Sequence, residues 1–220
     1  MDTSHGISCL CTNEYCDTIP EIPTDLGPNK YVVYTSSKEG LRLEQKIGTF
    51  AKNDPLPASP TSSPPPRRIS VNDKITYQTI YGFGNAITDA AVINYNKMDQ
   101  SIKNLLLKQY WGSESDGTDF DIGRIPISST DFSTHVYSYD DVYNDYDLKN
   151  FSIQVDHDSG KIDFIKKVQS LKPNISFFAT SWAPPAWMTK QNTTIKNPSL
   201  RTDNNIPQIY SNYRKFSPTP

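Results

Sequence analysis

Residues 80–91 read IYGFGNAITDAA, and this stretch decides the fold that the sequence predicts. It predicts a strand that ends at Gly82 and Gly84 and a helix that opens at Asp89, so that a carboxylate at this turn can face a ligand. Residues 121–133, DIGRIPISSTDFS, and residues 175–185, ISFFATSWAPP, repeat the pattern of a short apolar strand followed by polar or aromatic side chains. Parallel α/β folds keep their functional residues at this end of the strands. The sequence therefore predicts an α/β fold with its site at that edge.

Strand starts are predicted near Thr76, Asp121 and Ile175, and they lie farther apart than the roughly 30 residues of a minimal βαβ unit. Apolar residues at helical spacing predict two helices between these strands. The first follows Asp99 and presents Ile102, Leu105, Leu106 and Tyr110 before Gly112, and the second presents Ile162, Ile165, Val168 and Leu171 before Pro173. Residues 206–216 predict a third helix, and residues 128–151 predict a long loop after the second strand.

Composition excludes several classes of function. The 220 residues include 22 basic and 24 acidic side chains, with a formal net charge of −2. This balance gives no electrostatic reason to bind nucleic acid or an anionic membrane surface. No stretch of roughly 18 consecutive apolar residues predicts a membrane-spanning helix. Gly82 and Gly84 suggest a dinucleotide-binding turn, but the third glycine of that fingerprint falls on Ile87, so no cofactor is predicted.

Six segments follow one another along the chain: GFGNAITDAA, NLLLKQYW, RIPISSTDFS, YSYDD, LKNFSI and SWAPPAWM. This series resembles the glucosylceramidases of glycoside hydrolase family 30, the lysosomal acid β-glucosidases, from about Cys9 to about Tyr213. The resemblance implies a (β/α)8 TIM barrel, of which about the first three strands fit within this chain. It also implies a retaining β-glucosidase of sphingolipid metabolism, which hydrolyses glucosylceramide to glucose and ceramide.

Composition and the resemblance together divide the chain into four parts. Alternating residues at 31–35 and 41–47, around a turn at residues 38–40, predict a β-hairpin, which in the family belongs to a β side domain. The four parts are a cysteine-containing segment with this hairpin at residues 1–53, a Pro/Ser-rich linker at 54–74, the start of the TIM barrel at 75–216 and a divergent tail at 217–220. The linker departs from the family, which has an apolar strand near this point.

Three residues at the predicted strands and turns are candidate site residues. For Asp89, the residues alone leave a helix N-cap and a ligand contact equally open, whereas the matching aspartate in the family hydrogen-bonds glucose hydroxyls. Trp182 can pack in the core or stack on the apolar face of a sugar, and its family counterpart lines the glucose subsite. Arg124 lies within an apolar strand, where an unpaired charge is costly, so we expect it to meet a carboxylate. In the family the matching arginine orients the catalytic nucleophile.

No catalytic residue is predicted within these 220 residues. Retaining glycosidases use two carboxyl groups about 5–5.5 Å apart. The family places these glutamates on later strands, one of them in an Asn-Glu-Pro motif, but Glu114 is the last glutamate of this sequence and the motif does not occur. Asp89 and Asp131 make a poor substitute pair, and the three histidines form no recognisable triad. We therefore expect this chain to be an inactive, truncated N-terminal portion of such an enzyme.

The three cysteines lie close together near the N-terminus. Their spacing is typical of disulfides in a secreted protein, with one partner absent. A zinc site formed by His5, Cys9, Cys11 and Cys16 is the alternative, although a C-x-C spacing is tighter than that of most structural zinc sites. The resemblance implies a disulfide between Cys11 and Cys16, with Cys9 left without its family partner.

Three sequons, at Asn150, Asn174 and Asn192, predict glycosylation, although an unmodified turn asparagine is equally open at Asn174. The resemblance implies a lysosomal or secretory protein that contacts a membrane surface and an activator protein. Residues 1–6 have neither a basic n-region nor an apolar h-region, so we expect no signal peptide there. A rival interpretation makes the chain a non-catalytic relic that binds a sugar or a protein, either through Asp89 and Trp182 or through the cysteine segment.

Overall fold

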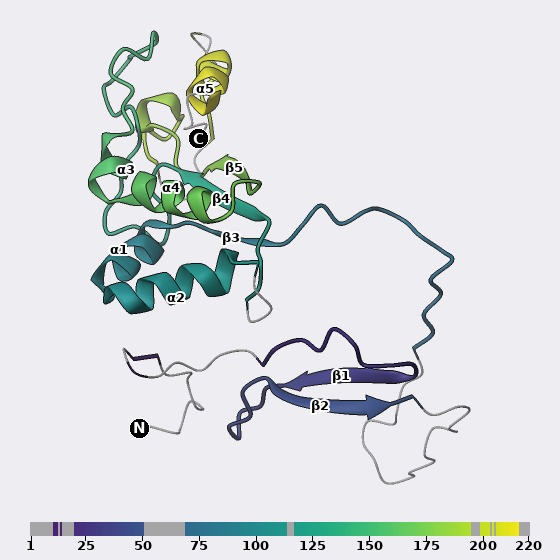
Figure 1. Cartoon of the computed structure of the whole chain (residues 1–220). Coiled ribbons are helices and arrows are strands. Elements are labelled where there is room, and N and C mark those ends of the chain that lie inside the picture. The colour runs from purple at the N-terminus through teal and green to yellow at the C-terminus, as the bar shows by residue number, and fades with distance from the viewer. Residues whose placement is uncertain are drawn as a thin grey trace. The chain divides into compact units, whose positions relative to one another are not determined.

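The computed structural model describes residues 11–12, 14, 20–50, 69–113, 117–194, 199–202, 204 and 206–215. The chain divides into two compact units, Met1–Tyr81 and Gly82–Pro220. A two-stranded antiparallel sheet lies in the first unit and a three-stranded parallel sheet in the second (Figure 1). None of the helices among the described residues has the length and hydrophobicity of a membrane span.

The hairpin of the first unit is confirmed. Strand β1 (Lys30–Thr35) pairs with β2 (Glu44–Thr49) in an antiparallel register that runs from Lys30 opposite Thr49 to Thr35 opposite Glu44. In the predicted turn, the Gly40 amide donates to the Ser37 carbonyl over 3.2 Å. The second strand begins at Glu44 rather than at residue 41, because Leu43 adopts the left-handed backbone with φ 45° and cannot continue a strand.

The parallel sheet of the second unit has the order β3-β4-β5 and consists of β3 (Gly84–Ala86), β4 (Ile122–Ile127) and β5 (Ser176–Ser181). The predictions near Asp121 and Ile175 are confirmed to within one residue, but the strand start near Thr76 is wrong. Residues 75–81 are extended and exposed, and pairing with β4 begins only at Gly84. A Cβ at Gly84 would lie 1.8 Å from the Ile122 carbonyl oxygen, so this close approach requires glycine.

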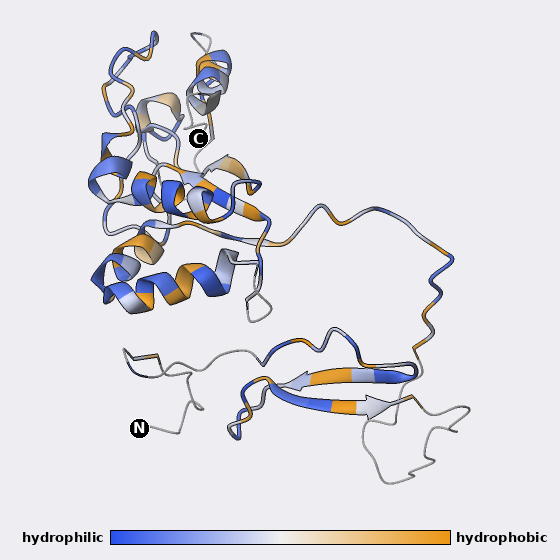
Figure 2. Cartoon of the chain, in the orientation of Figure 1, coloured by the Kyte–Doolittle hydropathy of each residue, from blue (hydrophilic) through white to orange (hydrophobic). Residues whose placement is uncertain are grey.

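The helices of the second unit follow the predicted order. They are α1 (Asp89–Lys97), α2 (Gln100–Trp111), α3 (Gln154–Asp158), α4 (Lys161–Leu171), the short 3-10 helix η1 (Ala186–Met188) and α5 (Ile206–Lys215). The predicted face of α2 is displaced, because Leu107 and Trp111 are buried whereas Tyr110 is exposed. Along α2 and α4, apolar and polar residues alternate, as the ribbon colours in Figure 2 show.

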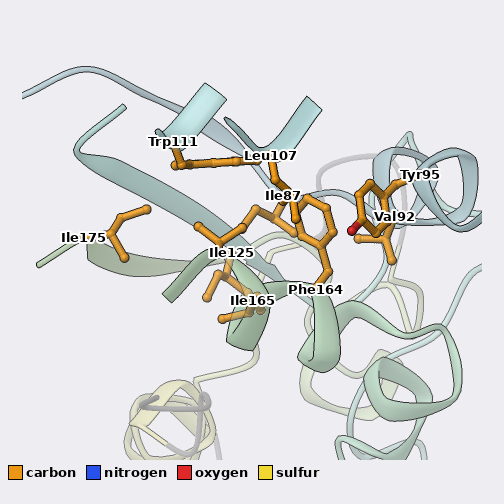
Figure 3. Packing of buried hydrophobic residues seen from close by; sticks show 10 residues of the cluster. Ile87, Val92, Tyr95, Leu107, Trp111, Ile125, Phe164, Ile165 and Ile175 are labelled. Atoms are coloured by element: carbon orange, nitrogen blue, oxygen red, sulfur yellow. The ribbon is translucent and has the colours of Figure 1, made fainter. Parts of the chain in front are cut away.

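The main core joins one face of the parallel sheet to α1, α2 and α4. Side chains from all three helices converge on Ile125 of β4 and on Ile87, which follows β3 (Figure 3). A second buried cluster contains residues of β4, of the loop that follows it, of η1 and of α5. Ile127, Tyr139, Trp187 and Tyr213 are among its members. The first cluster holds the helices on the sheet, and the second fixes the loops beyond the carboxyl end of β4.

Candidate functional site

Asp89 is not the helix N-cap that the residues alone left open. Thr88 holds that position, and its Oγ1 accepts a hydrogen bond from the Ala91 amide at 3.3 Å. Asp89 is the first helical residue of α1, and its side chain is only 6% exposed. The carboxylate is thus free of the capping task and is directed into a buried polar cluster.

The two oxygens of Asp89 have different surroundings. Oδ2 accepts hydrogen bonds from the Ser133 hydroxyl at 2.5 Å and from the Tyr137 hydroxyl at 2.8 Å. Oδ1 has a single partner among the described residues, Lys161 Nζ, which lies 2.6 Å away in an ion pair. An ionised carboxylate offers about four acceptor positions. Oδ1 is therefore the atom of Asp89 with acceptor capacity left for a ligand.

Burial opposes ionisation of Asp89, but its partners reverse that effect. The contact with Lys161, the hydrogen bonds from Ser133 and Tyr137 and the charge of Lys161 together outweigh desolvation and lower the pKa of the Asp89 carboxyl. Desolvation, the charge of Asp156 and the bond to Asp89 raise the pKa of Tyr137, so its hydroxyl remains a donor. The cluster keeps Asp89 as a charged acceptor.

Lys161 and Asp156 complete the cluster, and neither was predicted from the sequence as a site residue. Lys161 is fully buried at the start of α4, where its Nζ also donates to Asp156 Oδ1 at 2.8 Å and to the Tyr137 hydroxyl at 3.2 Å. Asp156, in α3, is fully buried as well and accepts a further hydrogen bond from the Tyr139 hydroxyl. A sequence signal for Lys161 exists, because it falls at helical spacing from Ile165 and Val168 on the apolar face of α4.

Arg124 and Trp182 form a second group, on the sheet face away from the main core. Nε of Arg124 donates to Thr180 Oγ1 at 3.1 Å, and the guanidinium carbon lies 4.8 Å from the centre of the Trp182 ring. Among the described residues Arg124 forms no ion pair, so the carboxylate partner expected from the sequence is not seen there. Trp182 is 46% exposed, which contradicts the core alternative and leaves ring surface for a ligand.

Both groups lie at the same edge of the parallel sheet. Asp89 follows β3, Ser133 and Tyr137 follow β4, and Trp182 follows β5, with its amide bonded to the Ile127 carbonyl at 3.2 Å. A charged acceptor and a half-exposed indole ring are what a sugar hydroxyl and a sugar C–H face need. The arrangement has the groups that a carbohydrate site needs. Its two buried carboxylates among the described residues, Asp89 and Asp156, are both paired with Lys161, so they do not form a free pair for hydrolysis.

The remaining predicted positions lie apart from these groups. Asn150, Asn174 and Asn192 are exposed, and the Asn150 amide group donates to Asp145 Oδ2 at 3.1 Å. Cys11 is disulfide-bonded, but Cys9 and Cys16 lie outside the described residues, so the pairing stays a prediction. His5 lies outside them too, and the part of the chain that is described contains no cluster of three metal-binding side chains.

Comparison with known proteins places this geometry in a family. Residues 80–216 match the glycosyl hydrolase family 30 TIM-barrel domain. The Caenorhabditis elegans protein named "Putative glucosylceramidase 4" is 39% identical over 91% of this chain and 37% of its own length. Lysosomal acid glucosylceramidase of Mus musculus is 30% identical over 83% of this chain and 34% of its own length. The chain thus spans less than two-fifths of these relatives.

Solved structures agree on the fold. The endo-β1,6-glucanase BT3312 superposes with a TM-score of 0.61 at 26% identity, over 84% of this chain and 38% of that one. SrfJ from Salmonella typhimurium gives 0.62 at 23% identity, over 84% of this chain and 39% of the other, and at this identity it supports the fold alone. The three parallel strands are therefore part of a TIM barrel, and the chain belongs to glycosyl hydrolase family 30.

Proposed function

We propose that this chain is part of a retaining β-glucosidase that hydrolyses glucosylceramide to glucose and ceramide, and that it supplies part of the glucose subsite. The observation that carries the proposal is the state of Asp89, a buried carboxylate held charged by Lys161 while Oδ1 keeps acceptor capacity. Such an acceptor binds a sugar hydroxyl by a charge-assisted hydrogen bond. Trp182, exposed at the neighbouring strand end, supplies the stacking surface.

The proposal assigns the bond-breaking chemistry to residues outside these 220. Retaining hydrolysis needs an acid/base and a nucleophile about 5–5.5 Å apart. Asp89 and Asp156 are both bound to Lys161, which suits them to binding and structure rather than to attack on a sugar. Arg124, on the exposed sheet face, is proposed to orient the nucleophile of the whole protein. The 220 residues by themselves are proposed to be inactive.

A second candidate substrate has support of its own. The endo-1,6-beta-D-glucanase of Neurospora crassa is 31% identical, but over 61% of this chain and 27% of its own length. Relatives named as glucosylceramidases match 83–94% of the chain, so we place glucosylceramide first and a β-1,6-glucan second. Both substrates present a β-linked glucose to the same edge of the sheet.

The proposal is tested on the full-length protein that contains this chain. We expect release of glucose from glucosylceramide to exceed release from β-1,6-glucan. Trp182→Ala should raise KM for a β-glucoside through loss of stacking, whereas Asp163→Asn, an exposed carboxylate on α4, is the matched control and should leave kinetics unchanged. Faster hydrolysis of the glucan would favour the second substrate, and no hydrolysis of either would overturn the proposal.

The cellular setting follows from the same resemblance. We propose a lysosomal protein that carries glycans at Asn150, Asn174 and Asn192, all of which are exposed. Contact with a membrane surface and with an activator protein is proposed with it, because glucosylceramide is a membrane lipid. Endoglycosidase treatment of the full-length protein from cells tests the glycans, and a mass that does not change would remove that part of the proposal.

A further inference from the structure

We propose that Lys161 is the positioning residue of the sugar site, which orients Asp89 and keeps it ionised in acid, and that Asp156 limits this effect by sharing the same ammonium group. This inference rests on the proposed function. It starts from the burial of Lys161, which is complete although the residue opens a helix and has four methylene groups with which to reach solvent. A buried ammonium is costly unless it is paired and hydrogen-bonded. Its position therefore calls for a role beyond filling space.

Three contacts fix the position of Lys161 Nζ. It lies 2.6 Å from Asp89 Oδ1, 2.8 Å from Asp156 Oδ1 and 3.2 Å from the Tyr137 hydroxyl. A lysine ammonium has three protons, and these contacts engage all of them. The ammonium consequently cannot swing away from Asp89 without losing the other two partners. A cation fixed in this way can hold a carboxylate in one orientation.

The contacts of Asp89 show which atom is held for the ligand. Ser133 and Tyr137 occupy both acceptor positions of Oδ2, whereas Lys161 is the one partner that the described residues give Oδ1. Oδ1 is thus oriented by charge and remains able to accept. Removal of Lys161 would leave a buried carboxylate with desolvation unopposed by any cation, which favours the neutral acid.

Asp156 acts in the opposite direction. It is fully buried, and the cluster then holds two carboxylates against one ammonium. A second carboxylate disfavours ionisation of Asp89 by like charge and also draws on the cation that supports it. Removal of Asp156 should therefore lower the pKa of Asp89, whereas removal of Lys161 should raise it. Two substitutions in one cluster with opposite effects on a third residue distinguish positioning from general support of the fold.

The experiment measures kcat/KM for a soluble β-glucoside from pH 2.5 to 7 in the full-length protein. The acid limb of this profile reports groups that must be ionised in the free enzyme. We expect Lys161→Met to move the acid limb upward by about 1–3 pH units, the range for loss of an adjacent opposite charge. Asp156→Asn should move the limb downward, and Lys161→Arg should restore it toward the wild-type position. Asp163→Asn, on the same helix but exposed, is the control.

A purely structural role gives another result. All variants would then lower the amount of active enzyme equally at every pH, and the limb would stay in place or move in one direction for both Lys161→Met and Asp156→Asn; either outcome overturns the inference while the proposed function stands. If Lys161→Met fails to fold, Asp156→Asn and Lys161→Arg still decide it.

A readout that needs no turnover separates this inference from the proposed function. Unfolding midpoints of the wild type, Asp89→Asn, Lys161→Met and the double variant are compared between pH 4 and 7. We expect Lys161→Met to lower the unfolding midpoint more in the protein that keeps Asp89 than in the Asp89→Asn variant. This difference should be larger at pH 7 than at pH 4. Additive effects at every pH overturn the coupling. Absence of β-glucoside hydrolysis by the wild type overturns the proposed function, and with it the sugar-binding role of Lys161.

Discussion

At the scale of single residues, Thr88 and Asp89 divide two tasks that the sequence assigned to one position. The residues alone left Asp89 as either cap or ligand contact, because both tasks favour aspartate before an apolar helix. The structure gives the cap to Thr88 and turns Asp89 toward Lys161. Two adjacent substitutions should therefore have different consequences.

Thr88→Ala should lower the free energy of unfolding by about 1 kcal/mol, the usual loss for an N-cap, and leave kcat/KM nearly unchanged. Asp89→Asn should lower transition-state stabilisation by about 1.5–3 kcal/mol, the range for a hydrogen bond to a charged group. Denaturant unfolding and β-glucoside kinetics of the full-length protein measure both. Equal kinetic losses in the two variants would show that helix α1, and not the carboxylate, determines activity.

Asp140 is a further buried carboxylate, but among the described residues it forms no ion pair. It is 1% exposed, and both of its carboxylate oxygens are buried. Burial, with the charges of Asp145 and Asp141, raises the pKa of Asp140 to about 6, although the nearby Val142 amide offsets part of the rise. The folded state therefore binds this proton more tightly than the unfolded chain does, so stability rises as the pH falls from about 6 toward 3.8, the ordinary pKa of the group.

Asp140→Asn should remove this pH dependence. The thermal midpoint of the variant should exceed that of the wild type at pH 7.5, where the buried charge costs stability, and the two should converge near pH 4.5, where Asp140 is protonated. Thermal unfolding at the two pH values is the measurement. A variant that is less stable than the wild type at pH 7.5 would mean that the charge has a stabilising partner.

At the scale of secondary structure elements, the sequence predicted what local pattern determines. The apolar spacing of Ile162, Ile165, Val168 and Leu171 located α4; the first three are buried, whereas Leu171 at its end is exposed. The buried face of α2 was displaced by one residue, because its tertiary partners, and not its own periodicity, select Trp111 over Tyr110. The first strand of the parallel sheet was predicted to begin too early for a related reason. Residues 75–83 have strand-like composition, but the ladder with β4 begins only at Gly84.

Gly160 joins α3 to α4 in the left-handed conformation, with φ 79°. An added Cβ would also meet the Asn96 side chain at 2.9 Å. Gly160→Ala should therefore destabilise the protein by about 1–2 kcal/mol from the backbone alone. Because the next residue is Lys161, we also expect a lower kcat/KM. Chemical unfolding tests the first effect, and Lys166→Ala, at an exposed helical position of α4, is the control. An equal loss in both variants would remove the special role of the turn.

At the scale of the whole molecule, the motifs located the parallel sheet and the strand ends that carry Asp89 and Trp182. They could not reveal the cluster around Lys161, because Tyr137, Asp156 and Lys161 come from three segments that only the tertiary fold brings together. The parallel sheet has two edges at which further strands could pair. Among the described residues β3 and β5 each pair on one side only, and Phe178 is exposed on the face opposite the helices.

The 220 residues expressed by themselves should consequently be poorly packed. Unpaired strand edges and exposed aromatic side chains favour aggregation. We expect binding of a hydrophobic dye, a broad thermal transition and no hydrolysis of β-glucosides. Dye fluorescence, calorimetry and an activity assay measure these, with the full-length protein as the control. A sharp, cooperative melt from a monomer would contradict the prediction.

The placement of Lys161 also sets an order of events during synthesis. Lys161 leaves the ribosome about 70 residues after Asp89, an interval of roughly 4–14 s at 5–20 residues per second. During that time α1 emerges with its carboxylate but without the cation that belongs to it. The residues of the cluster around Lys161 have thus all emerged before β5 and Trp182 leave the ribosome. A nascent chain halted once residue 161 has emerged already exposes every residue of that cluster.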